Sequence, residues 1–369
     1  MIVVASCGHN CDDERIYYKQ IDTLSSNGYK IKYYTYCYDS YLNEEHNNNI
    51  EYCFFNSSEI SQKQYKTLLF NSLKNDPPNV FHIHDMELLS VAYKLKKIHS
   101  QTKIIYDIHE DLNAMWDTFS SYSGIIKKII NSILSKYEKR YLQCIDYFIL
   151  ANRLARLEKY KSYAKIKIIE NFPLSTRIQE IQNIDKPNKL IYHGQFGEDR
   201  GVITLINAFN QISQTNQLLE LVLIGTPRNK NFGIKLNQYI YNNSKIKLIP
   251  QIPHSEIWGY LNDAHIGVIP FHDELIWRYN TPTKLFEYMA SNCAIVSSDL
   301  MPIREFCDKS ISWAKPEDTQ SLINSINYYL NNPDIYNEHR NINNQLIKTN
   351  FNWESISNNI LNIYKELSN

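Results

Sequence analysis

The chain has 369 residues, in which 39 Lys and Arg balance 39 Asp and Glu, so its formal net charge at pH 7 is zero. This balance excludes a global field that would attract nucleic acid or an anionic membrane, and any anion-binding site must therefore be local. At roughly 150 residues per domain, the length predicts two domains.

Cysteine usage and the first residues indicate an intracellular chain. The seven cysteines form no C-x-x-C pair and lie in apolar segments, which is typical of free thiols, and metal binding by Cys7 and Cys11 is the less favoured alternative. "MIVVASCGHNCDDER" (1–15) has no basic lead, so we expect a first strand there and no signal peptide. No run reaches the ~18 uncharged apolar residues of a spanning helix. We expect a cytoplasmic protein, free or held peripherally at the inner face of the plasma membrane.

Short β-branched runs alternate with helical patterns along the whole chain, which predicts parallel sheets covered by helices. In the first half the expected strands are residues 2–6, 29–36, 50–55, 79–84, 103–109, 146–150 and 165–169. In the second half they are residues 190–194, 219–225, 246–250, 265–270 and 293–298. A polar segment, "STRIQEIQNIDKPNK" (175–189), separates the two series.

The predicted fold class is α/β, with two tandem Rossmann-like domains, each a doubly wound parallel sheet, that face a cleft. The predicted boundaries are 1–172 for the first domain, 173–188 for a linker and 189–350 for the second domain. Residues 351–369 form a last helix, which we expect to pack back across the linker with one apolar face made of Ile356, Ile360, Ile363 and Tyr364. Ligands of such sheets bind beyond the carboxyl ends of the strands, so the cleft is the expected site.

Two segments of the second half suit a phosphate. "HGQFGEDRG" (193–201) follows a strand, and its glycines let backbone N–H groups approach an anion while Arg200 can bind two oxygens. In "TPTKLFEYMASNCAIVSSD" (281–299) we expect Thr281 as N-cap and Pro282 as first helical residue, so that Lys284 opposes the helix dipole unless an anion docks there. Glu287 is on the same helix face and can accept hydrogen bonds from two hydroxyl groups. Alternatively, it can simply form an ion pair with Lys284.

In the first half, "HIHD" (82–85) and "YDIHE" (106–110) each end a strand with His and acid. His84, Asp85, Asp107 and His109 can meet across adjacent strands, but their spacing is not that of a known metal site, so satisfied core histidines are the favoured interpretation. In "DDERIYYK" (12–19) the acids suit a helix N-terminus.

Residues 124–142, "GIIKKIINSILSKYEKRYL", hold five basic residues and one acid beside several isoleucines. Such a helix can rest on an anionic bilayer, although a core-facing amphipathic helix is the commoner explanation. Peripheral membrane contact through 124–142 is therefore the alternative expectation.

The segments "NTPTKLFEYMASNCAIVSSD" and "YHGQFGEDRGVITLINAF" resemble the donor-binding segment P-x-K-x-x-E-x-M-A and the glycine loop of the nucleotide-sugar-dependent glycosyltransferases of family 4, which have the GT-B fold. "VFHIHDMELL", "IIYDIHED" and "DDERIYYK" resemble the first-domain segments of a branch frequent in bacterial surface-polysaccharide assembly. The resemblance covers nearly the whole chain.

The resemblance implies that Arg200 and Lys284 hold the donor diphosphate, that Glu287 binds the ribose and that His109 faces the donor sugar. The other residues that it places around the donor are Gly194, Gln195, Gly225, Ile252, Thr283 and Leu285. Weaker candidates on the acceptor side are Asp13, Arg15, Asp85 and Glu110.

Two departures from the family pattern stand out. Gln195 replaces the usual Arg and Arg200 the usual Lys, so one phosphate cation is lost, and Tyr279 replaces the first residue of a glutamate pair. Asp273 or Glu274 can serve the sugar hydroxyls instead.

The predicted function is metal-independent, retaining transfer of a sugar from a nucleoside-diphosphate sugar to a hydroxyl of a glycan or lipid-linked glycan, in bacterial surface-polysaccharide synthesis. The nucleotide sugar is a co-substrate, and no cofactor and no nucleic-acid partner are expected. The alternatives are a nucleotide-sugar epimerase of the same fold and a non-catalytic nucleotide-sugar-binding subunit.

Overall fold

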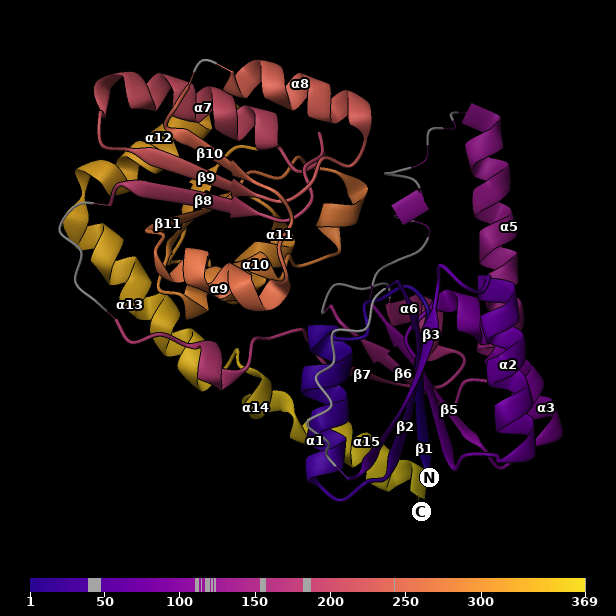
Figure 1. The fold of residues 1–369 in the computed structure, drawn as a ribbon. Coiled ribbons are helices and arrows are strands. Elements are labelled where there is room, and N and C mark those ends of the chain that lie inside the picture. Colours follow the sequence, from indigo (N-terminus) through magenta and orange to yellow (C-terminus); the bar gives the residue numbers. More distant parts are fainter. Residues whose placement is uncertain are drawn as a thin grey trace. The chain divides into compact units, whose positions relative to one another are not determined.

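The computed structural model describes residues 1–38, 48–109, 113, 115–116, 120, 122, 124–152, 157–181, 187–241 and 243–368. The chain divides into two compact units, which are described one at a time (Figure 1). Unit 1 comprises residues 1–171 and 356–369, and unit 2 comprises residues 172–355. None of the described helices is both long enough and apolar enough to cross a membrane.

Unit 1 is built on a seven-stranded parallel sheet in the order β3-β2-β1-β4-β5-β6-β7. Its strands are β1 (Ile2–Ser6), β2 (Ile31–Cys37), β3 (Ile50–Asn56), β4 (Val80–Ile83), β5 (Lys103–Ile108), β6 (Tyr147–Leu150) and β7 (Lys165–Ile168). The strand order reverses between β1 and β4, and this switch point is where ligands of doubly wound sheets bind. All of β1 is buried, because helices cover both faces of a parallel sheet, and this explains its unbroken apolar run.

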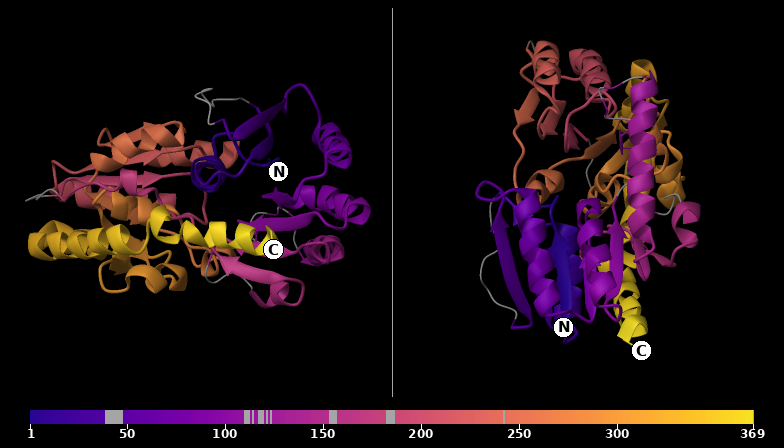
Figure 2. Two further views of the ribbon diagram at one scale, coloured as in Figure 1. Left: turned by 90° about the horizontal axis from the view of Figure 1, so that it is seen from below. Right: turned by 90° about the vertical axis from the view of Figure 1, so that its right-hand side faces the viewer.

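The helical elements of unit 1 are η1 (Glu14–Ile21), α1 (Asp22–Ser26), α2 (Gln62–Asn75), η2 (Met86–Leu88), α3 (Leu89–Ile98), α5 (Gly124–Leu142), α6 (Leu157–Lys161) and α15 (Asn358–Ser368). The C-terminal helix α15 lies beside the strands of unit 1 (Figure 2). Its Tyr364 hydroxyl is 2.8 Å from Nδ1 of His82, at the centre of the sheet.

Unit 2 has a six-stranded parallel sheet in the order β10-β9-β8-β11-β12-β13. Its strands are β8 (Lys189–His193), β9 (Glu220–Ile224), β10 (Ile246–Ile249), β11 (Ile266–Ile269), β12 (Ala294–Ser298) and β13 (Ser312–Ala314). Here the order reverses between β8 and β11, so the loops that follow these two strands frame the expected ligand position.

The helical elements of unit 2 are η3 (Ser175–Arg177), α7 (Val202–Thr215), α8 (Lys230–Ile240), α9 (His254–Asn262), η4 (Leu275–Arg278), α10 (Lys284–Ala290), α11 (Met301–Cys307), α12 (Thr319–Asn331), α13 (Pro333–Thr349) and α14 (Trp353–Ile356), whose last residue belongs to unit 1. Every residue of α10 is buried. The side chains that α10 presents at the strand ends are therefore held inside protein.

The sequence predicted the α/β class with two parallel sheets correctly, and each expected strand occurs with small shifts at its ends. Strand β13 was missed because "SWA" is too short for a recognisable apolar run. The first helix begins as a π-helix, in which Lys19 and Gln20 are buried and Tyr17 is half-buried. The expected last helix is interrupted at Ser357.

The expected N-cap of α10 is wrong. The residue at that position is Thr283, in helical conformation and with no side-chain hydrogen bond to the helix, so Lys284 is the first helical residue. Pro282 lies before the helix, where its carbonyl accepts a hydrogen bond from Leu285 N. Because α10 has only seven residues, we base the anion site on side chains and not on its dipole.

Candidate functional site

The glycine loop, residues 194–201, leaves the carboxyl end of β8 and lies against the ends of β9 and β11. Gly194 N donates to Ile224 O and Phe196 N to Thr226 O, both at 2.9 Å. Gly201 has a φ of 61°, and a Cβ there would lie 1.7 Å from the carbonyl oxygen of Pro270. Only glycine lets the loop pass this close to the strand end, so the loop is fixed in place.

Two cationic side chains meet beside this loop, one from the loop and one from α10. The Lys284 Nζ lies 4.6 Å from the ring centroids of both Tyr192 and Phe271. The Arg200 guanidinium lies 5.7 Å from the same Phe271 ring and 4.8 Å from that of Trp277. Since both cations contact one ring, they face one region of unit 2. A Cβ on Gly194 would lie 3.5 Å from Lys284 Nζ, so the backbone of the loop faces the same amine.

Lys284 is 4% exposed, and no described side chain forms an ion pair or hydrogen bond with its amine. Burial, and then the nearby charge of Arg200, hold the pKa of Lys284 well below its ordinary value. The Nε of Arg200 has no hydrogen-bond partner among the described residues and lies 4.0 Å from an Asp199 oxygen. A buried amine beside a second cation has a high free energy, which an anionic ligand would lower.

Glu287 is also buried, and histidines face both of its oxygens. His254 Nε2 donates to Oε1 at 2.7 Å, and His193 Nε2 lies 3.0 Å from Oε2, although the angle of that pair does not suit a hydrogen bond. Burial alone would raise the pKa of Glu287, yet the two histidines hold this pKa well below its ordinary value. Pairing of Glu287 with Lys284, the alternative considered from the sequence, is not observed. His193 is the first residue of the segment 193–201 that the sequence analysis singled out, but neither histidine was predicted.

Arg228, which the sequence did not predict, lies against the glycine loop. It follows β9, its Nε donates to Gln195 Oε1 at 2.9 Å, and its Nη1 and Nη2 bind the two oxygens of Asp199 at 2.6 and 3.2 Å. Trp277 Nε1 donates to the same carboxylate at 3.2 Å. The side chain of Gln195 therefore holds Arg228 against the glycine loop. In the family pattern the loop itself carries an arginine at this position.

The remaining donor-side candidates differ in how they can act. Gly225 has a φ of 147°, and a Cβ there would lie 2.0 Å from the Gly194 oxygen, so it allows two strand ends to approach. Ile252 is half-buried and Thr283 is exposed, so both can contact a ligand. Leu285 is fully buried and its N–H donates to Pro282 O, which leaves it a packing role.

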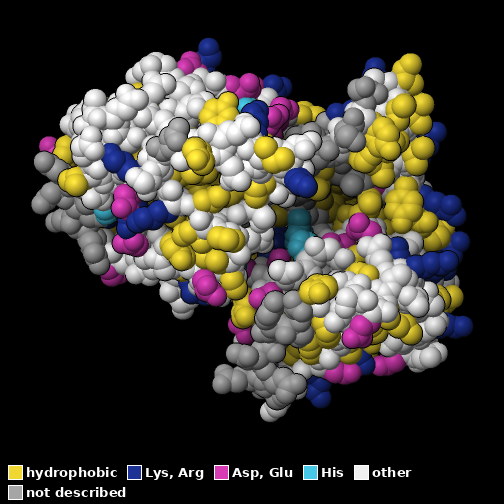
Figure 3. All heavy atoms as spheres, turned by 45° about the horizontal axis from the view of Figure 1, so that its top comes forward, with side chains coloured by type: hydrophobic (Ala, Val, Ile, Leu, Met, Phe, Trp, Pro, Cys, Tyr) yellow, Lys and Arg dark blue, Asp and Glu magenta, His cyan; other side chains and the backbone are white. Residues whose placement is uncertain are grey.

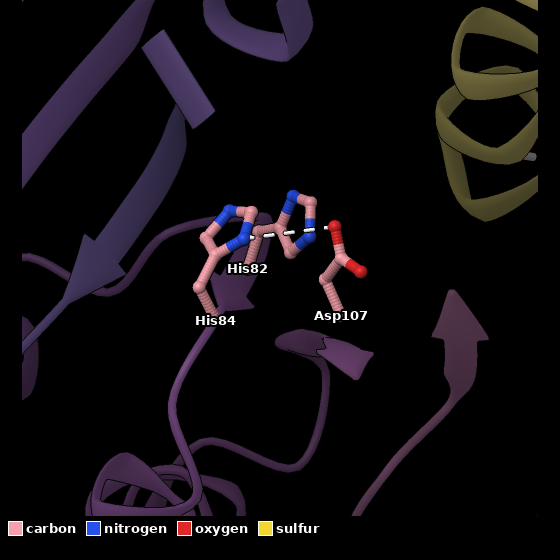
Figure 4. A group of neighbouring side chains, drawn as sticks. All are labelled: His82, His84 and Asp107. Carbon is pink, nitrogen blue, oxygen red and sulfur yellow. Dashed lines mark ion pairs between the residues drawn. The ribbon is translucent and has the colours of Figure 1, made fainter. Parts of the chain in front are cut away.

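In unit 1, histidines and acids meet at the carboxyl ends of β4 and β5. His84 Nδ1 lies 3.6 Å from Asp107 Oδ2 (Figure 4). The same nitrogen lies 3.3 Å from His109 Nε2. Burial lowers the pKa of His109 to about 4, although Asp107 opposes this shift, so the imidazole is neutral at pH 7. A neutral histidine can donate one hydrogen bond to a sugar hydroxyl and accept another.

The ligand atoms of His82, His84 and Asp107 lie within 4.8 Å of one another, which is close enough to hold a metal ion. However, Asp107 accepts hydrogen bonds from Nε and Nη2 of Arg15 at 3.1 and 3.0 Å and from Gln20 at 2.6 Å. These donors occupy the carboxylate, and a guanidinium at this distance would repel a cation. The arrangement favours a buried polar network over a metal site.

His9, at the end of β1, was missed by sequence reasoning. Its ring centroid lies 4.5 Å from that of His109, and its two nitrogens lie 3.2 Å from Asp13 and 3.4 Å from Asp85. Although burial opposes it, the two carboxylates raise the pKa of His9 to about 9, so the ring is cationic at pH 7. Its position after the central strand was the available signal, but its spacing matches no motif.

Three of the four acceptor-side candidates have structural partners. Asp13 caps η1 through the N–H groups of residues 15 and 16, and all three guanidinium nitrogens of Arg15 bind Asp107 or the Ile169 oxygen. Asp85 accepts from Cys7 N at 2.6 Å. Glu110 lies outside the described residues.

The two doubly wound parallel sheets place the chain in the GT-B fold class. Residues 175–365 match the family described as Glycosyl transferases group 1, and this match covers over half of the chain. The chain belongs to this family, as the sequence predicted. No curated protein matches the sequence.

Solved structures of the same fold align over nearly the whole chain. A sucrose-phosphate synthase from Thermosynechococcus elongatus has a TM-score of 0.78 at 15% identity, and covers 99% of this chain and 98% of its own. HepE of Anabaena, in complex with UDP and glucose, has a TM-score of 0.73 at 13% identity and covers 99% of each chain. A glycosyltransferase from Rickettsia africae has a TM-score of 0.69 at 15% identity, with 99% and 98% covered. At these identities the likeness shows the fold.

Proposed function

We propose that this glycosyltransferase moves a sugar from a nucleoside-diphosphate sugar to an acceptor hydroxyl with retention of anomeric configuration and without a metal ion. The observation that carries the proposal is the buried amine of Lys284, which shares the Phe271 ring with Arg200. Together these two cations offer the charge and hydrogen-bond donors that a diphosphate requires.

In the proposed reaction, the bond between the anomeric carbon and the diphosphate oxygen breaks, and the acceptor oxygen bonds to that carbon on the same face. The acceptor proton leaves with the nucleoside diphosphate. Arg200 and Lys284 stabilise the negative charge that develops on the departing oxygen, and because they are already in place, little reorganisation is needed. Since Lys284 is shielded from water, its charge acts through a low effective dielectric constant.

Arg228 contributes the third cation in this proposal. In the family pattern an arginine occupies the position of Gln195. Arg228 takes the place of that arginine in the proposal, because Gln195 and Asp199 fix its guanidinium. Asp199 neutralises part of its charge, so we assign it a weaker share of diphosphate binding.

In the proposal, Glu287 accepts hydrogen bonds from the ribose hydroxyls. These hydroxyls replace one of the two histidines beside its carboxylate. His254 is the one to move, because its side chain is 39% exposed whereas that of His193 is 7% exposed. In unit 1 we assign His109, as a neutral imidazole, to the donor sugar. The acceptor class that we propose is a glycan or lipid-linked glycan of a bacterial surface polysaccharide, on the basis of the first-domain motifs.

The test is a thermal-shift screen with UDP, GDP, ADP and their sugars, because a ligand that binds only the folded state raises its melting temperature. Any diphosphate that does so is then supplied as its sugar, with a panel of glycan acceptors, and the product is followed by NMR. Transfer with retained anomeric configuration supports the proposal. Conversion of the donor sugar without acceptor would identify an epimerase, and binding without turnover would identify a binding subunit.

A further inference from the structure

Helix α5 exposes a row of large apolar side chains that the core does not cover. Only Glu138 and Leu142, both in its last two turns, are buried. The exposed isoleucines and their exposed fractions are Ile125 (76%), Ile126 (54%), Ile129 (53%) and Ile133 (58%). The core-facing helix expected from the sequence is therefore wrong for the first three turns of α5.

These isoleucines form one surface. Ile125, Ile129 and Ile133 repeat every four residues, so they lie in one stripe along the helix, and Ile126 lies beside it. Tyr122, just before the helix, is 51% exposed and stacks on Trp116 with ring centroids 6.1 Å apart. Hydrophobic side chains gather along the projecting end of α5, with Lys and Arg beside them (Figure 3).

The charges on α5 have one sign. Its exposed basic residues are Lys128, Lys136, Lys139 and Arg140, and Lys127 is half-buried. The single acid, Glu138, is buried, where it pairs with Lys159 and accepts from the Tyr160 hydroxyl at 3.1 Å. Lys136 and Arg140 continue the isoleucine stripe toward the end of the helix. We call the four isoleucines with the four exposed basic residues the α5 patch.

We propose that the α5 patch docks this protein on an anionic lipid bilayer. An apolar stripe with basic neighbours and no exposed acid is what a helix needs to lie in the plane of an interface, with its side chains among the acyl chains and its cations at the headgroups. Aromatic side chains such as Tyr122 and Trp116 are favoured at the same level. A second copy of this chain fits less well, because pairing two such faces would bring together cations of the same sign.

Docking would bring unit 1 to a surface where lipid-linked acceptors reside, although the inference itself stands on the α5 patch and not on the reaction. Docking on a bilayer also explains why the first turns of α5 expose isoleucines and not polar residues. Contiguous exposed apolar side chains in a soluble unit mark an interaction surface.

The experiment is flotation of the full-length protein with vesicles of phosphatidylglycerol and phosphatidylcholine, at low salt and in 0.5 M NaCl. The wild type is compared with a triple variant, Ile125→Ser, Ile129→Ser and Ile133→Ser, and with a control, Ile234→Ser, on the exposed face of α8. Ile234 is 54% exposed, so it matches the patch in accessibility. We expect binding to anionic vesicles, a partition coefficient lower by a factor of ~10 or more in the triple variant, and no change in the control.

A second variant, Lys136→Glu with Arg140→Glu, tests the charges and is expected to weaken binding at low salt while binding in 0.5 M NaCl changes little. Each variant must keep the wild-type melting temperature and its response to nucleotide, which separates this inference from the proposed function. Absence of wild-type binding to anionic vesicles, or equal binding by the triple variant, would overturn the proposal. So would a wild-type dimer that the triple variant converts to a monomer without any vesicle binding.

Discussion

Replacing Lys284 by Met should stabilise the ligand-free protein while removing its response to nucleoside diphosphates. The amine and the Arg200 guanidinium lie 4.6 and 5.7 Å from the centroid of the Phe271 ring, so the two charges are at most about 10 Å apart. At an effective dielectric constant of about 20, unit charges at that distance repel by about 1.7 kcal/mol. Dehydration of the amine adds to this cost, and its two ring contacts return about 0.5–1 kcal/mol each.

The net expectation for Lys284→Met is a rise of about 2 kcal/mol in the free energy of unfolding, or roughly 4–8 °C in the melting temperature of a unit of this size. The variant's advantage should shrink at alkaline pH. Because folding lowers the pKa of Lys284, the unfolded chain binds more protons, and wild-type stability rises toward pH 10 as the amine deprotonates.

The assay is differential scanning fluorimetry with and without UDP or GDP, with Lys309→Met as a control because Lys309 is exposed in the same unit. The control should keep the wild-type melting temperature and the nucleotide-induced shift. A Lys284→Met variant that is less stable than the wild type would refute the electrostatic reasoning. One that still responds fully to nucleotide would show that the diphosphate binds elsewhere.

Three other expectations follow from particular contacts. Arg228→Gln should weaken nucleoside-diphosphate binding by about tenfold, as measured by calorimetry, because about 1.4 kcal/mol of charge-assisted contact is lost; unchanged affinity would exclude Arg228 from the site. Gly201→Ala should lose about 3 kcal/mol or more in urea unfolding, since its Cβ would strike the Pro270 backbone, whereas Gly259→Ala, which meets nothing within 4 Å, should be neutral or stabilising. Burial lowers the pKa values of His82 and His109 to about 4. The free energy of unfolding should therefore be highest above pH 6.5 and should fall by up to about 3 kcal/mol per histidine between pH 6.5 and 4. A free energy of unfolding in urea that does not change over this pH range would contradict this.

The sheets were predictable because strands buried on both faces are apolar throughout and stand between helical patterns. The run "IVVAS" is fully buried as β1, and an acid caps the helix after it, although the capping residue is Asp13 and not Asp12. The burial of Arg15 in that helix was not predictable, since its partner Asp107 is a residue 92 positions away.

The site was predictable only in part, for the same reason. Arg200 and Lys284 stand in segments whose composition suits phosphate, and the structure brings them to one ring. The arginine that binds Gln195 comes from another loop, 33 residues away, and no local pattern connects the two. Likewise, the partners of Glu287 lie in separate segments, so only the folded chain shows that its carboxylate is already held.

In the proposed function, these contacts let Arg228 supply part of the positive charge that the glycine loop lacks. An arginine in the glycine loop and Arg228 both offer a guanidinium group, but Arg228 also needs its hydrogen bond to Gln195. If that contact matters, Gln195→Ala should weaken nucleotide binding as much as Arg228→Gln does, whereas the double variant should weaken it no further than either single change. Full additivity of the two changes would mean that Gln195 contacts the ligand directly and that the cation lost from the loop has not been replaced.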